Sequence, residues 1–167
     1  MAVDEEPFAG FLKIWHLVHV VAASFLIGPH FSRNSEYMSY IEEYCLNVPH
    51  FVHQYFWVPA PLRKLFWYLS PSGFRVRKVI KNLKSFIIPE IRRTIAIWRT
   101  TGRSPDEYTL LGAMLDLKEE RGIIKRDATA MSREEEERQI DVFSDEVIFT
   151  AFDSAGPVAC FVAQLLF

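Results

Sequence analysis

Apolar residues recur along this chain in dense runs whose spacing is typical of helices. Residues 8–27 are apolar on nearly every side and stop at a Gly-Pro pair, which predicts a first helix that packs inside a larger body. Either Ser32 or Asn34 then caps a second helix that extends to about Val48, with acidic residues on one side and tyrosines on the other. The first 48 residues are therefore predicted to be mainly helical.

Prolines divide the middle of the chain. An aromatic segment begins at Phe51 and ends at Leu69, and its prolines predict short helical turns and loops. A long basic helix is expected over residues 74–101, and Pro89 inside it predicts a kink or a division into two helices. The sequence then holds a clear stop, beginning at Gly102.

Two capping boxes and a final apolar run complete the chain. The boxes predict helices over residues 108–118 and through the acidic run 134–137, and they consist of Ser104 with Glu107 and Ser132 with Glu135. Residues 142–167 are strongly apolar. We find no internal repeat, and 167 residues suffice for one core, so residues 1–167 are expected to form a single all-α domain.

The charge of the chain is small in total but uneven. A net charge of −2 supplies no general attraction for nucleic acid. Residues 63–103 are rich in Lys and Arg with Glu90 as their single acid, whereas residues 132–146 are mainly acidic. Two interpretations stay open for the basic stretch: a solvated helix face beside a core, or a surface for anionic lipid or an acidic protein.

The cysteines and the N-terminal residues bear on localisation. Cys45 and Cys160 lie far apart without a disulfide framework, which fits a reducing compartment. The first residues are acidic, unlike a signal peptide. Residues 11–27 contain Lys13, His16 and His19, so this segment is predicted to be a buried or interfacial helix that does not span a membrane. The expected location is the cytoplasm or the endoplasmic-reticulum membrane surface.

Histidines are the candidates for a metal site. His16 with His19, and His50 with His53, are each three residues apart and could share a helix face. No HExxH motif occurs and no carboxylate stands at ligand spacing, so we interpret these histidines as structural and expect no metal. Phosphate-loop, dinucleotide-binding and hydrolase motifs are also absent from the sequence.

The final apolar run contains the most specific local pattern. Phe152-Asp-Ser-Ala-Gly-Pro157 places an acid that the apolar surroundings predict to be buried, Asp153, beside the small residues Ala155 and Gly156. One interpretation is a kinked helix in which Asp153 binds backbone groups that the proline frees. The other is a distorted helix that crosses a buried ligand, where small residues allow close approach.

Four stretches, in the same order, resemble the middle helices of fungal-type cytochrome P450s. They begin at Ala23 (Ala23-Ser-Phe-Leu-Ile-Gly-Pro29 with Ser32-Arg-Asn-Ser-Glu-Tyr37), Ile88 (Ile88-Pro-Glu-Ile-Arg-Arg93), Tyr108 (through Leu110-Leu111 to Met114-Leu115-Asp116) and Phe152. The last resembles the long central helix that passes over the haem in this family. The resemblance implies a partial P450-like helical fold, all-α, that ends in the central helix. It also implies that Asp153, Ala155 and Gly156 face the haem.

The family's catalytic residues are missing from these matches. The resemblance implies haem-thiolate monooxygenases of secondary metabolism, which bind haem through a cysteine in an FxxGxRxCxG-type loop. Neither Cys45 nor Cys160 stands in such a loop, and Glu90 with Arg93 has the spacing of the family's ExxR pair but lies far upstream of it. Where the family places an acid and a threonine, this chain has Pro157, Val158 and Ala159, none of which moves a proton.

These observations predict a truncated P450-like chain that is inactive alone and binds no cofactor, although the full-length family binds haem. The alternative is a non-enzymatic helical interaction or membrane-surface protein, with the segment from Phe51 to Leu69 and the following basic helix as its contact surface. Self-association through exposed apolar helices is expected in either case. A third hypothesis is a small helical cofactor-binding protein that uses the histidine pairs.

Overall fold

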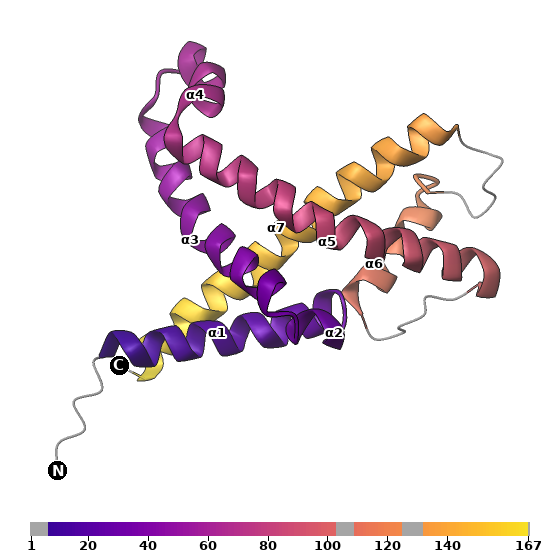
Figure 1. The fold of residues 1–167 in the computed structure, drawn as a ribbon, viewed down its shortest axis with the longest axis horizontal. Helices are drawn as coiled ribbons and strands as arrows, with labels where there is room; N and C mark the ends of the chain where they lie inside the picture. The colour runs from indigo at the N-terminus through magenta and orange to yellow at the C-terminus, as the bar shows by residue number, and fades with distance from the viewer. Residues whose placement is uncertain (1–6, 103–108, 125–131, 167) are drawn as a thin grey trace.

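The structure is a computed structural model that describes residues 7–102, 109–124 and 132–166, without the side chains of residues 7–12, 152 and 154–166. Within these ranges the chain is helical and has no strand, which confirms the all-α prediction (Figure 1). The elements are α1 (Pro7–Leu26), α2 (Pro29–Ser32), α3 (Ser35–Trp57), the 3-10 turn η1 (Ala60–Leu62), α4 (Arg63–Leu69), α5 (Pro71–Thr101), α6 (Leu110–Glu120) and α7 (Arg133–Leu166).

Polar side chains cap the helices near the predicted places. Asn34 caps α3, because its side-chain oxygen accepts hydrogen bonds from the backbone N–H groups of Glu36 at 3.0 Å and Tyr37 at 3.1 Å. The predicted Ser132 cap of α7 is confirmed, since its hydroxyl oxygen accepts from the Glu135 N–H at 3.2 Å. Thr109 caps α6, and the predicted box of Ser104 with Glu107 lies outside the described residues.

Two prolines lie inside helices, and the boundary predicted at Val48 was wrong. The second helix does not end at Val48, because α3 continues through Pro49 to Trp57. α5 likewise runs undivided through Pro89. A proline removes one backbone hydrogen bond, but the apolar stripe continues past each of them. Phe51 is buried in α3, and Ile87 and Ile91 are buried in α5. This packing offsets the lost hydrogen bonds.

The helices pack around one apolar core. α3 lies along α5, α1 lies along α7, and α7 crosses α5, as Figure 1 shows. The largest fully buried side chains come from α1, α3, α5, α6 and α7, and they include His19, Tyr37, Leu83, Ile91, Trp98, Leu115 and Phe143. The start of α5, α4, η1 and the end of α3 extend away from this core at one end of the molecule. We call this part, residues 50–78, the tip.

Ion pairs join the basic helix α5 to the acidic helix α7. Lys84 Nζ lies 2.8 Å from an Asp141 carboxylate oxygen and 2.9 Å from one of Asp145. Two further pairs lie along the same crossing, Arg92 with Glu137 at 3.3 Å and Arg99 with Glu136 at 2.7 Å. From Lys84 to Arg99, the basic residues of this stretch are therefore paired with acids of the chain.

Lys84 is the centre of this contact. Burial of its amine lowers the pKa, but the hydrogen bonds to Asp141 and Asp145 outweigh burial and hold the pKa of Lys84 above its usual value. A raised lysine pKa means that the folded state binds the proton more tightly than the unfolded state does. The contribution to stability is thus complete at neutral pH and is lost only as the pH rises through the folded pKa.

We expect Lys84→Met to lower the free energy of unfolding by about 1 kcal/mol at low salt, a modest loss because both carboxylates are solvated and screened. The loss should shrink at high salt. Urea unfolding at both ionic strengths measures it. Lys81→Met is the matched control, because Lys81 is exposed on the same helix. Equal effects of the two substitutions would contradict a role for the ion pairs.

Candidate functional site

The three residues that the sequence singled out lie in the second half of α7. Asp153 is exposed, so the prediction that this acid is buried was wrong. Ala155 and Gly156 belong to α7, but their side-chain surroundings lie outside the described residues. The haem-facing role of the three residues stays a prediction.

The body of the fold contains a buried contact between a thiol and an imidazole. His19 of α1 and Cys45 of α3 are 1% and 2% exposed, and His19 Nε2 lies 3.2 Å from Cys45 Sγ. His19 Nδ1 is 2.8 Å from the carbonyl oxygen of Trp15, so this nitrogen carries the proton and donates it. Nε2 is then the acceptor, and the Cys45 thiol donates to it. The pair joins α1 to α3.

Burial keeps both partners neutral. It raises the pKa of the Cys45 thiol to about 12, with a smaller contribution from the charge of Glu42. It also lowers the pKa of His19, which outweighs the hydrogen bond to Trp15. A reactive or metal-binding cysteine needs a thiolate in an electropositive, accessible place. Cys45 has none of these properties and is a structural residue.

We expect Cys45 to resist a disulfide-exchange thiol reagent in the folded chain at pH 7, because the thiolate is disfavoured and covered. The measurement uses a Cys160→Ser variant, so that Cys45 is the one thiol present. The same variant in concentrated urea is the control and should react fully. Rapid modification of the folded variant would overturn the structural assignment.

His16, His50 and His53 each contact one nearby side chain. His16 Nδ1 lies 2.6 Å from a carboxylate oxygen of Glu42, and His50 Nε2 lies 3.0 Å from the side-chain nitrogen of Gln54. His53 faces the ring of Trp57, with 6.3 Å between the ring centroids. Within the described ranges, no three His, Cys, Asp or Glu side chains lie close enough together to hold a metal ion.

Glu90 and Arg93 form a pair on α5. The guanidinium of Arg93 donates to both carboxylate oxygens of Glu90, with Nε at 3.0 and 3.1 Å. Glu90 is buried, and His30 Nε2 of α2 lies 3.6 Å from its other side. The pair therefore neutralises a buried carboxylate of α5, at the point where α2 approaches this helix.

The tip exposes large apolar side chains. None of the residues of η1 or α4 is buried, and Phe56, Trp57 and Leu69 are 70%, 79% and 72% exposed. Monomeric soluble proteins rarely leave an apolar surface of this density uncovered. In the part of the chain that the structure describes, none of the helices combines the length and hydropathy needed to cross a membrane.

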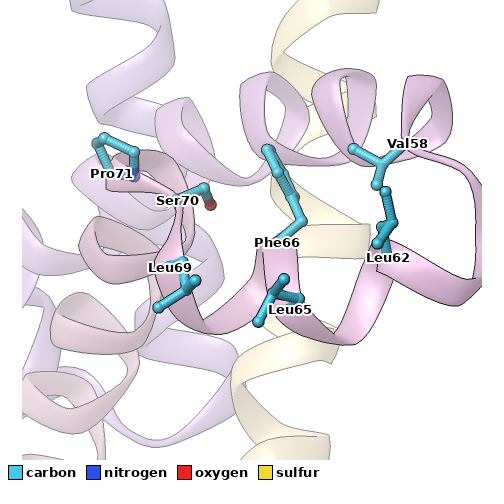
Figure 2. A pocket seen from close by; sticks show the side chains of 7 residues that line it. All are labelled: Val58, Leu62, Leu65, Phe66, Leu69, Ser70 and Pro71. Atoms are coloured by element: carbon cyan, nitrogen blue, oxygen red, sulfur yellow. The ribbon is translucent and has the colours of Figure 1, made fainter.

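An apolar pocket of about 400 Å³ opens in this surface (Figure 2). Its walls come from the end of α3, from η1 and α4, and from the start of α5, and they consist of Val58, Leu62, Leu65, Phe66, Leu69, Ser70 and Pro71. Figure 2 shows the Phe66 ring between the side chains of Leu62 and Ser70. Ser70 supplies the one polar side chain, and it also caps α5 by accepting from the Gly73 N–H at 3.0 Å.

Two arginines hold the tip in shape. Arg63 donates from Nε to the Val58 carbonyl at 3.1 Å, and its guanidinium lies over the Tyr55 ring. Arg77 donates to the carbonyl oxygens of Trp67 and Tyr68 and lies over both rings. The sequence did not predict these contacts, because the partners lie five to ten residues apart and on different elements or turns. The alternation of aromatic and basic residues was the one sequence feature that indicated them.

Comparison with known proteins gives the chain its relatives. Along its whole length of 167 residues it is 62% identical to the cytochrome P450 monooxygenase verB of Clonostachys rogersoniana, and it covers 32% of that protein. Over 154 residues it is 28% identical to the cytochrome P450 monooxygenase afvE of Aspergillus flavus, again covering 32%. No family model and no solved structure matches the chain.

These relatives confirm the predicted resemblance to fungal cytochrome P450s. The chain spans about a third of the length of the curated relatives that it matches. The activity of a whole relative does not follow from this third alone.

Proposed function

We propose that this chain is the helical segment before and within the central helix of a haem-thiolate monooxygenase, and that the 167 residues alone carry out no oxygen activation. The 62% identity over the whole chain to a P450 monooxygenase supports the first part of the proposal. In such an enzyme the haem would supply the oxygen chemistry. The segment would supply a rigid wall of packed helices.

The described residues do not fit a haem ligand set, which supports the second part. Cys45 is the one cysteine whose side chain the structure describes, and its thiol is buried and donates to His19. Its thiol does not line the pockets found at the tip. Coordination by Cys45 would require breaking the pair with His19 and removing a proton whose pKa is about 12. No catalytic step is therefore assigned to these residues.

Titration of the purified chain with haem tests this proposal. We expect no stoichiometric binding and no thiolate-type absorption band after reduction and addition of carbon monoxide, because no accessible thiolate is present among the described residues. Cys45→Ser and Cys160→Ser variants are the controls for weak adventitious binding. A thiolate-type spectrum that disappears in either variant would contradict the proposal and identify the ligand.

The tip favours a second role, contact with a membrane surface. Its exposed apolar side chains are flanked by Lys64, Arg75 and Lys78, all exposed. Apolar side chains that enter the boundary of a lipid layer, together with basic side chains at its anionic surface, are typical of interfacial binding. We infer that the tip rests on an anionic membrane, as an interaction surface of the chain.

Sedimentation with vesicles of phosphatidylglycerol and phosphatidylcholine tests the membrane role. We expect Trp57→Ser combined with Leu69→Ser to lower the vesicle-binding constant about a hundredfold or more, since burying each large apolar side chain gains about 1.5–3 kcal/mol. Leu17→Ser with Phe25→Ser is the matched control, because both residues are 61% exposed but lie on α1. Equal loss in both double variants would refute a specific role of the tip.

A further inference from the structure

A second pocket adjoins the apolar one and has a different character. Its volume is about 550 Å³, and it lies between the end of α3 and the start of α5. Its lining is rich in hydrogen-bond donors and comprises His50, His53, Gln54, Trp57, Phe66, Ser70, Pro71, Ser72 and Arg75. Both volumes lie in the range of about 300–1,000 Å³ that small-molecule sites occupy.

Hydrogen bonds fix the polar wall of this pocket. The Ser72 hydroxyl donates to Gln54 Oε1 at 2.6 Å, and the Gln54 amide nitrogen donates to His50 Nε2 at 3.0 Å. In the neutral ring the proton of His50 is therefore on Nδ1. This chain links the start of α5 to α3, and it holds the His50 ring with a donor nitrogen directed away from Gln54.

The electrostatic character of the pocket is cationic. Arg75 contributes a guanidinium at an exposed position, and no carboxylate belongs to the described lining. Further along α5 the basic side chains are paired with acids, since Lys84, Arg92 and Arg99 each face a carboxylate of α7. A guanidinium and imidazole N–H groups around one pocket suit a carboxylate or a phosphate.

The two pockets share three lining residues, Phe66, Ser70 and Pro71. A donor-rich pocket thus lies beside one whose walls are almost entirely apolar. From this arrangement we propose that the tip binds an anionic amphiphile, with its acidic head at Arg75, His50 and His53 and its alkyl chain along Leu62, Leu65 and Leu69. The occupant is defined by its chemistry, a single carboxylate or phosphate on an alkyl chain.

This site goes beyond the proposed function, because it requires neither haem nor the rest of a monooxygenase. Its ligand has two sources, a dissolved amphiphile such as a fatty acid or an anionic lipid within a membrane. Monomeric decanoate and decyl phosphate, below the concentrations at which they form micelles, represent the first source. Phosphatidylglycerol vesicles represent the second.

Equilibrium dialysis of the 167-residue chain against decanoate, decyl phosphate and neutral decanol tests the site. We expect saturable binding of both anions and weaker binding of decanol. Arg75→Gln should weaken anion binding about tenfold, because it removes a charge-assisted contact. The matched control is Arg92→Gln, an exposed arginine on the same helix that pairs with Glu137. Circular dichroism checks that the variants keep their helical content.

A pair of leucine variants tests the part of the site that would hold the alkyl chain. Leu65→Gln lies in the apolar pocket, and Leu46→Gln, 60% exposed on α3, lies outside it. The proposal expects weaker decanoate binding in Leu65→Gln alone. Equal effects of Arg75→Gln and Arg92→Gln, or decanol binding as tight as decanoate binding, would overturn it. Binding to vesicles without any binding of the monomeric anions would also overturn it and leave only a membrane-contact surface.

Discussion

The contact between the basic helix α5 and the acidic helix α7 organises the rest of the structure. Lys84 lies between Asp141 and Asp145, and Arg92 and Arg99 continue the row of ion pairs toward the C-terminal end of α5. Such partly exposed pairs add little stability individually. Their consequence here is the choice of partner, because the basic face of α5 meets the acidic face of α7 along the crossing. The apolar core beneath them supplies the larger share of the stability.

The same contact divides the basic stretch into two parts with different roles. Its second half is neutralised by α7, which agrees with the interpretation as a solvated helix face beside a core. Its first half reaches the tip, where Arg75 and Lys78 are exposed beside apolar side chains. The sequence left two interpretations open for this stretch. The ion pairs with α7 favour a solvated face beside a core for the second half, and a contact surface in the first half stays a proposal. Overall charge could not separate them, since the answer depends on where α7 crosses.

Local signals in the sequence predicted local structure well. The all-α class, the Asn34 and Ser132 caps and the start of the basic helix could be inferred, because each depends on neighbouring residues. The continuation of α3 through Pro49 could not, since tertiary packing of Phe51 overrides the proline signal. At Pro89 the sequence left open whether there is one helix or two, and α5 is one. The pair of His19 and Cys45 joins positions 26 residues apart and has no sequence signature. The exposure of Asp153 likewise depends on which side of α7 meets α1.

Among the side chains that the structure describes, two exposed apolar surfaces stand out, and their charge distinguishes them. On α1, Leu17, Val21 and Phe25 are each 61% exposed and follow one another at intervals of four residues, so they form one stripe. No arginine stands among them, and self-association through this stripe stays a prediction. At the tip, the apolar side chains surround a pocket that adjoins a cationic one. The stripe on α1 offers apolar contacts and suits another protein surface, whereas an apolar pocket beside a guanidinium suits a partner with both an alkyl chain and a negative charge.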